Sequence, residues 1–404
     1  MDDDTNNSYE CNDDDESEEF VSERLPTSNN VIRGQKDAYA VGKKIASGKY
    51  GAVYEVLRRR DGKMFAAKLE VCGVAALNSL NMDYVVLKAA NKAKSDHFCN
   101  LVDRGMIQNH FKFLIINMLG DNLFKLRLQF QQHRFSAPTS LRLALQMLES
   151  LEQLHSLGYM HRDVKPSNFA LFEEGQIARI ILLDFGLCRH FKTASGGIKP
   201  PREKTQFRGT ARYASLAAHR EMEQSPKDDL ESWFYVVVEF MTGLADLFQL
   251  NVLANFSLGD LPWSHFSSSE RDSVKKAKEH ARTLEGMVHL LKYCPRMEFK
   301  RIITNLDGLQ YSNVPDYQYL RDLIILAMRN NDIRPDEPYD WEQQEVATEE
   351  AALTSSSTAK SDTKLTRMDD GRGGELIRNG PVNGGLEQKQ QQTNHQPNSN
   401  NAWR

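Results

Sequence analysis

The spacing of apolar residues changes along the chain and divides it into a strand-rich part, a helical part and two polar ends. From Tyr39 to about Asn117, short apolar runs between glycines and polar turns predict strands, with one helix at about 74–94. Beyond residue 121 the apolar residues recur mainly at helical spacing. Helices are predicted at 269–281, 295–305 and 316–330, so the second part is mostly helical.

The segment from Thr139 to Leu157 is the clearest predicted helix. Thr139 or Ser140 can cap its start, and Gly158 suits the position just after its end. Its apolar residues recur three or four positions apart, at Leu141, Ala144, Leu145, Leu148 and Leu151.

The two ends of the chain have too few apolar residues to offset the entropy lost on ordering, so both are predicted to be disordered. Residues 1–33 are acidic, with runs at Asp2–Asp4 and Asp13–Glu16. Such a tail either docks on a basic surface, competes with acidic substrates, or is only a solvated extension. Residues 347–404 are rich in Thr, Ser, Gly, Gln and Asn, and serve either as a linker or as a carrier of phosphorylation sites.

Composition limits the function classes. A hydrophobic content of 40% supports a folded core, and a net charge of −4 gives no reason to expect nucleic-acid binding. The longest apolar run, Trp233–Phe256, contains acidic and amide residues, so a buried helix is expected there and not a membrane span. Five scattered cysteines without C-x-x-C spacing, and an acidic start without a secretory leader, predict reduced thiols in the cytoplasm or nucleus.

The stretch His161–Asn168, followed by Asp184-Phe185-Gly186, has the strongest chemical content. Phosphoryl transfer from ATP to a hydroxyl needs a carboxylate that accepts the hydroxyl proton, and oxygen ligands for magnesium ions on the phosphates. Asp163 fits the first role, and Asn168 and Asp184 fit the second. D-F-G alone has little weight, but its position after the H-R-D-x-K-x-x-N loop makes the combined pattern specific.

On these motifs the chain resembles a protein kinase over residues 36–343. The resemblance implies an α+β, bilobal protein-kinase fold. A small β-rich N-lobe with one main helix is expected at about 36–117, and a larger, mostly α-helical C-lobe at about 121–343. It also implies ATP and Mg²⁺ as cofactors. Lys165, two residues after Asp163, is typical of kinases that act on Ser/Thr hydroxyls of proteins.

The resemblance implies roles for single residues. Asp163 is the expected catalytic base, Lys165 and Lys68 stabilise the phosphates, and Asn168 and Asp184 bind the metal. The other expected nucleotide contacts lie in a glycine turn, the strands beside it and the connection between the lobes: Ile45, Gly48, Gly51, Val53, Ala66, Met118 and Leu119.

Structural roles are expected for residues around the catalytic loop. His161 is expected to be a packed histidine and Arg162 an anchor of the loop. Asp229, near the start of a large C-lobe helix, is expected to hold the loop backbone through its carboxylate.

The N-terminal part departs from the family's pattern at two positions. The glycine turn has Ala46 where the first glycine is expected. The helix partner of Lys68 is Asp83 instead of glutamate, so the pair forms only if the helix lies closer or a water bridges it. Glu70 is an alternative partner but is expected to face outward. A pseudokinase scaffold, which binds nucleotide or partners without efficient phosphotransfer, is therefore the second hypothesis.

Further motifs indicate a branch of the family. The segment Gly209–His219 lacks the usual A-P-E ending and resembles the casein kinase I group, while Pro200-Pro201-Arg202 and Tyr339-Asp340-Trp341 resemble its tau-tubulin kinase branch. The resemblance implies acidic or phosphorylated protein substrates, with Arg212 and Lys227 at the anion-binding positions. A solvated basic face is the alternative explanation of the basic residues.

The segment at about 244–257 is longer than in the relatives that the resemblance suggests. It extends the preceding helix, forms a surface insert, or reflects an error in the gene model. The chain is expected to be a monomer.

Overall fold

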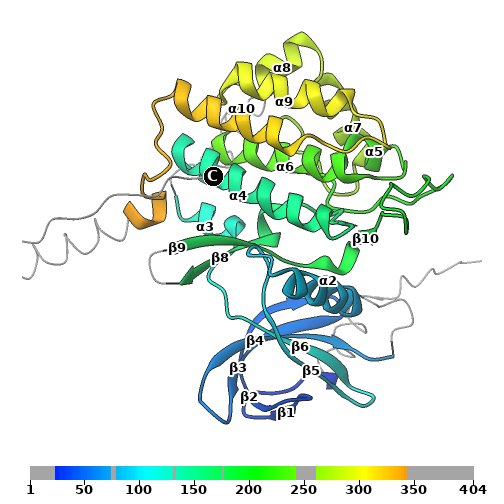
Figure 1. The fold of residues 1–404 in the computed structure, drawn as a ribbon, viewed down its shortest axis with the longest axis vertical. Helices are drawn as coiled ribbons and strands as arrows, with labels where there is room; N and C mark the ends of the chain where they lie inside the picture. The colour runs from blue at the N-terminus through cyan, green and yellow to red at the C-terminus, as the bar shows by residue number, and fades with distance from the viewer. Residues whose placement is uncertain (1–22, 74–78, 131–132, 175–176, 243–260, 344–404) are drawn as a thin grey trace, which may run out of the picture. The chain divides into compact units, whose positions relative to one another are not determined.

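The computed structural model describes residues 23–73, 79–130, 133–174, 177–242 and 261–343 (Figure 1). A sheet-rich lobe is followed by a mainly helical lobe, as the resemblance implies. The possible insert at 244–257 and the polar end at 347–404 lie outside the described residues. Among the described helices, none combines the length and the apolar character that crossing a membrane requires.

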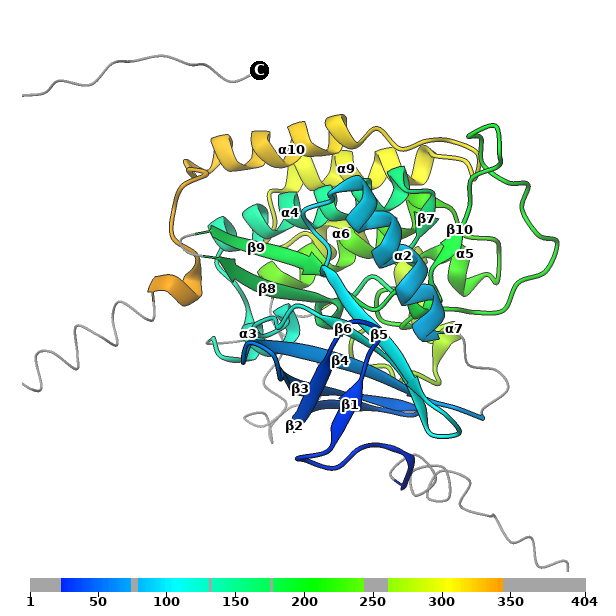
Figure 2. The ribbon, with the colours of Figure 1, turned by 60° about the horizontal axis from the view of Figure 1, so that its bottom comes forward.

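The N-lobe is built on one antiparallel six-stranded sheet with the order β1-β2-β3-β4-β6-β5. Helix α2 (Ser79–Ala93) packs against β4, β5 and β6 (Figure 2). The strands, in sheet order, are Val31–Arg33, Ala38–Gly48, Gly51–Arg58, Met64–Val71, Phe111–Ile116 and Leu101–Ile107. These spans confirm the strand-rich pattern. Burial alternates along β3, whereas β4 and β6 also bury consecutive residues.

The ordered domain begins earlier than predicted. Leu25 and Ile32 are buried in the core of the N-lobe, and β1 pairs with β2 inside the stretch expected to be a disordered tail. Burial of a few apolar residues is enough to order this segment, because the sheet on which they pack supplies the rest of the core. The predicted tail boundary at residue 33 is therefore wrong for residues 23–33.

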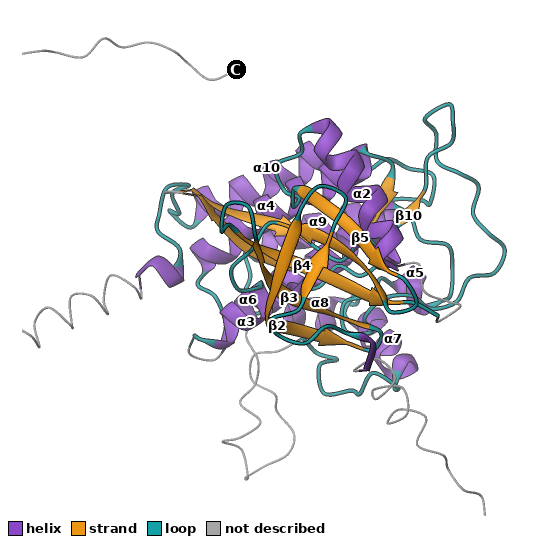
Figure 3. Cartoon of the chain, turned by 90° about the horizontal axis from the view of Figure 1, so that it is seen from below, coloured by secondary structure: helices purple, strands orange, loops and turns teal. Residues whose placement is uncertain are grey.

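Helices dominate the C-lobe, as Figure 3 shows in purple. Helix α6 (Pro226–Thr242) is its centre: every residue except Lys227 is buried, and α4, α5 and α9 pack around it. The other helices are α3 (Leu123–Leu128), α4 (Ala137–Ser156), α5 (Leu216–His219), α7 (Arg271–His280), α8 (Leu284–Leu290), α9 (Arg296–Gly308) and α10 (Tyr317–Asn330). Two short hairpins pair β8 (Phe169–Glu174) with β9 (Ile177–Leu182) and β7 (Tyr159–Met160) with β10 (Arg189–His190).

Helix α4 follows the predicted pattern but starts differently. Its N-cap is Ser136, whose hydroxyl accepts the N–H of Thr139, so the predicted cap at Thr139 or Ser140 is wrong. Pro138 explains the shift, because proline is favoured in the first turn, where its missing N–H costs nothing. Gly158 follows the helix with a φ of +89°, as predicted.

A buried ion pair joins α3 to α6. The Arg127 guanidinium lies 2.8 Å from the Glu239 carboxylate, and both side chains have no exposed surface. The same carboxylate accepts hydrogen bonds from Arg212 at 2.5 Å and from the Tyr213 hydroxyl at 2.9 Å. Removal of one member of such a pair leaves an uncompensated buried charge.

We therefore expect Glu239→Gln to lower the free energy of unfolding by about 3–5 kcal/mol, because Arg127 then remains charged in the core. Urea unfolding followed by circular dichroism measures the loss. The control is Asp272→Asn in the exposed pair with Lys275, which should leave the midpoint unchanged. An unchanged midpoint for Glu239→Gln would contradict the energetic role of the buried carboxylate.

Candidate active site

The catalytic loop is held by a carboxylate from α6. Asp229 accepts the backbone N–H of His161 at 2.6 Å and of Arg162 at 2.8 Å, and a His155 ring nitrogen lies 2.8 Å away. Arg162 has a φ of +68°, a strained conformation that these hydrogen bonds stabilise. Burial opposes ionisation, but the hydrogen bonds from His155 and the loop lower the pKa of Asp229. The expected role of Asp229 is confirmed.

The other two expectations for this loop also agree with the structure. The His161 side chain is fully buried, and one ring nitrogen lies 2.9 Å from the Leu183 carbonyl. The Arg162 guanidinium donates to the Leu187 carbonyl at 2.7 Å and so ties the loop to the segment after Asp184.

The carboxylate of Asp163 is oriented by two neighbours. The Lys165 ammonium lies 2.6 Å from one oxygen, and the Thr210 hydroxyl donates to the other at 2.7 Å. Lys165 also donates to the Thr210 hydroxyl, at 3.3 Å. Asp163 and Lys165 are therefore held together, with Thr210 between them.

Thr210 is a site residue that the sequence did not single out. Its place depends on Gly209, whose φ is +115°; a Cβ there would lie 2.7 Å from the Arg162 carbonyl oxygen. Only glycine allows this approach of the two backbones. The Gly-Thr pair was the available signal, but nothing local shows which loop it meets.

Asn168 and Asp184 fit the metal role by the chemistry of their oxygens. The Asn168 amide nitrogen donates to the Asp163 carbonyl at 2.8 Å, which leaves its carbonyl oxygen for other partners. The Leu183 N–H donates to the backbone carbonyl of Asn168 at 2.8 Å, so the two segments are tied together. Asp184 has a φ of +61°, and its side chain is half exposed. Carboxylate and amide oxygens are the donors that Mg²⁺ prefers.

Lys68 on β4 bridges two carboxylates. Its ammonium lies 2.7 Å from Asp83 on α2 and 2.9 Å from Asp184. Burial alone would lower the pKa of Lys68, but the two carboxylates outweigh it and raise the pKa. The charge of Lys68 in turn lowers the pKa of Asp184 to about 2. Asp83 thus reaches Lys68 directly despite its shorter side chain.

Asp83 also contacts the segment after Asp184. Its second oxygen accepts the N–H of Phe185 at 2.8 Å. The Phe185 ring stacks on Phe98, with centroids 5.6 Å apart, and lies 5.8 Å from the His161 ring. One carboxylate therefore links α2, β4 and the D-F-G segment.

Glu70 does not face outward, so that expectation is wrong. Its side chain is 5% exposed, and its carboxylate accepts the Ser79 hydroxyl and the Leu80 N–H at the start of α2. The Lys112 ammonium lies 3.0 Å away. The period of two along a strand explains the error, because Lys68 and Glu70 share one face of β4.

Three of the expected nucleotide contacts of the N-lobe share a face of the sheet. Val53 pairs with Lys68, so Val53, Lys68 and Ala66 point to the same side. Gly48 and Gly51 face each other at the β2–β3 turn, and a Cβ on Gly51 would lie 2.1 Å from the Leu69 carbonyl oxygen. Ile45 and Ala46 precede this turn on β2 and are exposed.

The connection between the lobes lies at 117–122. Within the described residues, Met118 and Leu119 use neither backbone N–H nor C=O in a hydrogen bond, while Gly120 N–H donates to the Leu171 carbonyl at 2.8 Å. Their backbone groups therefore remain open to a ligand, as the adenine role requires.

The two predicted anion-binding residues each have an internal partner. Arg212 is 24% exposed and bonds Glu239, and Lys227 is 19% exposed and lies 3.3 Å from Asp228. Their anion-binding role stays a prediction.

The sequence of the chain is similar to those of known protein kinases. A model of the protein kinase domain matches residues 39–302, well over half of the chain. The chain therefore belongs to the protein kinase family, and the predicted fold class is confirmed.

Two relatives with names as serine/threonine-protein kinases support this assignment. A probable serine/threonine-protein kinase of Dictyostelium discoideum is 33% identical over 310 residues, which cover 76% of this chain and 57% of the relative. The serine/threonine-protein kinase spe-6 of Caenorhabditis elegans is 30% identical over 332 residues, covering 81% of this chain and 82% of the relative. The family and these relatives confirm the prediction of a protein serine/threonine kinase.

The contacts of Asp83 lead to a prediction. Asp83→Asn keeps an oxygen for Phe185 but removes the charge that holds Lys68, so kcat/KM should fall roughly 10-fold to 100-fold, as for other groups that orient a charged ligand. Steady-state phosphotransfer assays measure it, with Asp272→Asn as the surface control. Unchanged kinetics would show that Asp83 is not needed to position Lys68.

Proposed function

We propose that this chain is an active protein kinase, which transfers the γ-phosphate of ATP to Ser/Thr hydroxyls of protein substrates. The observation that carries the proposal is the assembled Lys68–Asp83–Asp184 bridge next to an oriented Asp163. A scaffold without turnover has no chemical need for both arrangements at once.

The residues divide the chemistry as follows. Asp163 accepts the hydroxyl proton of the substrate, while Thr210 and Lys165 hold its carboxylate in place. Lys165 and Lys68 offset the charge of the phosphates. Asn168 and Asp184 would hold Mg²⁺, which when bound neutralises charge on the β- and γ-phosphates.

The pseudokinase alternative rests on Ala46 and Asp83. Asp83 contacts Lys68 directly, so the shorter acid gives no structural reason for inactivity. Position 46 pairs with Val53 within the β2–β3 ladder and is followed by both remaining glycines. The N-lobe geometry therefore favours the active kinase.

We also propose the casein kinase I group, its tau-tubulin kinase-like branch, and a preference for acidic or phosphorylated sites. Support comes from the motifs at 209–219 and 339–341 and from exposed cations in the segment after D-F-G. Lys204 and Arg208 are exposed and have no acidic partner among the described residues. Action in the cytoplasm or nucleus is proposed from the scattered cysteines.

Transfer from labelled ATP to casein tests the activity. The full chain should label casein, and Asp163→Asn should lower the rate by about 100-fold or more, because the general base is lost. Asp272→Asn serves as the matched carboxylate control. Equal labelling by wild type and Asp163→Asn, or none by either, would support the pseudokinase instead.

The substrate preference has its own test. Arg212→Ala should lower kcat/KM about tenfold more for a phosphorylated peptide than for the same peptide without phosphate, because charge-assisted hydrogen bonds to the phosphate are lost. Peptide assays with both forms measure the ratio, and Arg59→Gln is the control at an exposed cation. An equal loss for both peptides would show that Arg212 does not bind the phosphate of the peptide.

A further inference from the structure

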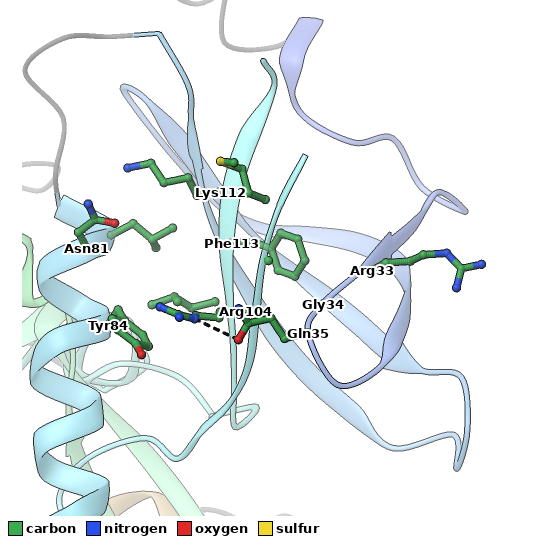
Figure 4. Close-up of a pocket in the computed structure, with 12 residues that line it drawn as sticks. Arg33, Gly34, Gln35, Asn81, Tyr84, Arg104, Lys112 and Phe113 are labelled. Atoms are coloured by element: carbon green, nitrogen blue, oxygen red, sulfur yellow. Dashed lines mark hydrogen bonds between the residues drawn. The ribbon is translucent and has the colours of Figure 1, made fainter. Parts of the chain in front are cut away.

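A pocket of about 380 Å³ lies on the N-lobe between α2 and the edge of the sheet (Figure 4). It is separate from the residues of the active site. One wall comes from the first turns of α2, through Leu80 and Tyr84, and the other from β5 and β6, through Arg104 and Phe113.

The rim of this pocket is fixed by a buried carboxylate. Asp103 is 3% exposed and accepts the N–H groups of Gln35, Lys36 and Asp37 in the β1–β2 connection. A Cβ on Gly34 would lie 2.2 Å from this carboxylate, and a Cβ on Gly105 would lie 2.3 Å from the Phe113 ring. The pocket is thus formed before any ligand binds, which lowers the entropic cost of binding.

The chemistry of the lining favours an anion with apolar neighbours. Its 12 residues include three cations and no carboxylate. Arg104 lies over the Tyr84 ring at 4.1 Å, bonds only the Gln35 amide at 3.3 Å, and has no acidic partner among the described residues. Figure 4 shows Arg104 and Tyr84 beside one another and Arg33 pointing away, so Arg104 and Lys112 are the relevant cations.

The pocket is coupled to the active site through α2. Tyr84 follows Asp83, the partner of Lys68, and Leu80 follows Ser79, the partner of Glu70. Lys112 lines the pocket and also pairs with Glu70. A ligand that bridges α2 and the sheet here would hold the helix in the position that the Lys68–Asp83 contact requires.

The first described residues contact the end of the strand that carries Glu70. Arg24 donates to the Cys72 carbonyl at 2.8 Å, and Leu25 is buried in the N-lobe core. Cys72 lies two residues after Glu70, about 7 Å along a strand from the Glu70–Lys112 contact. The residues just before Arg24 read Asp13-Asp14-Asp15-Glu16-Ser17-Glu18-Glu19-Phe20-Val21, acidic groups followed by two apolar side chains.

We propose that residues 13–21 of this chain bind in the pocket between α2 and β5–β6 as an acidic internal ligand. The carboxylates of the segment meet Arg104 and Lys112, and Phe20 enters the apolar part beside Tyr84. Residues 18–23 can span up to about 20 Å, which exceeds the roughly 7 Å between Cys72 and the Glu70–Lys112 contact at the pocket. Because the ligand is covalently attached, its effective concentration is high and modest contacts are enough.

Photo-crosslinking in the full chain tests the docking without any need for catalysis. A benzoylphenylalanine at position 20 should form links within one chain to residues 80–84 and 104–114, located by mass spectrometry. Arg104→Gln should reduce the yield about fivefold, a typical scale for one coupled ionic contact. Raising the salt concentration should reduce it further, because exposed charges are screened.

The tail itself offers a matched control. Glu16→Gln, Glu18→Gln and Glu19→Gln together should lower the yield, whereas Asp2→Asn, Asp3→Asn and Asp4→Asn remove the same charge farther from the anchor and should not. Three outcomes would each overturn the proposal. They are crosslinks to the segment 199–212, crosslinks between two chains, and a crosslinking yield that changes neither with Arg104→Gln nor with the substitutions at Glu16, Glu18 and Glu19. A thermal melt of each variant separates lost docking from lost folding.

A second readout follows helix α2. Neutralising Glu16, Glu18 and Glu19 should raise amide hydrogen exchange over 79–93 and lower kcat/KM about threefold, while the Asp2–Asp4 variant matches wild type. The kinetic arm rests on the proposed kinase activity, but the exchange and crosslinking arms do not. Unchanged exchange over α2 together with crosslinks elsewhere would rule out this docking even if the kinase is active.

Discussion

The catalytic loop depends on one buried interaction, the pair of hydrogen bonds from its backbone to Asp229. Without them Arg162 would not keep its positive φ, and the turn that places Asp163 would relax. Hydrogen bonds to this carboxylate are stronger than they would be on the surface, because it is shielded from water and accepts from several donors. The rigid helix α6 thus sets the geometry of a loop that has little stability of its own.

Helix α6 carries further buried carboxylates that accept hydrogen bonds along its length. Asp228 accepts the Ser225 N–H, Glu231 accepts the Leu216 N–H, and Glu239 joins Arg127 and Arg212. Asp228 caps the start of its own helix, whereas Glu231 and Glu239 fix segments that come from elsewhere in the chain. Loops of the C-lobe are therefore attached to one central helix, α6. The desolvation cost of burying each charge is offset by local hydrogen bonds.

The sequence was most informative where the chemistry is contiguous. The catalytic loop and the period of α4 could be recognised because all the signals lie within a few residues. Contacts between distant segments were less accessible: Thr210 meets Asp163 only through the close approach at Gly209. Glu70 could have been placed by the strand period, but its role as the cap of α2 depends on where the helix packs.

Helix α2 is fastened to β4 at two points, its first turn through Glu70 and its second through Asp83. A rigid rod fixed at two nearby points can no longer slide along the sheet or roll about its own axis without breaking a charged contact. Its far end is held as well, because the Asn91 side chain accepts the Leu101 N–H at 2.8 Å and donates to the Cys99 carbonyl at 3.3 Å. Movement of this helix away from β4 would therefore have to break the charged contact between Lys68 and Asp83.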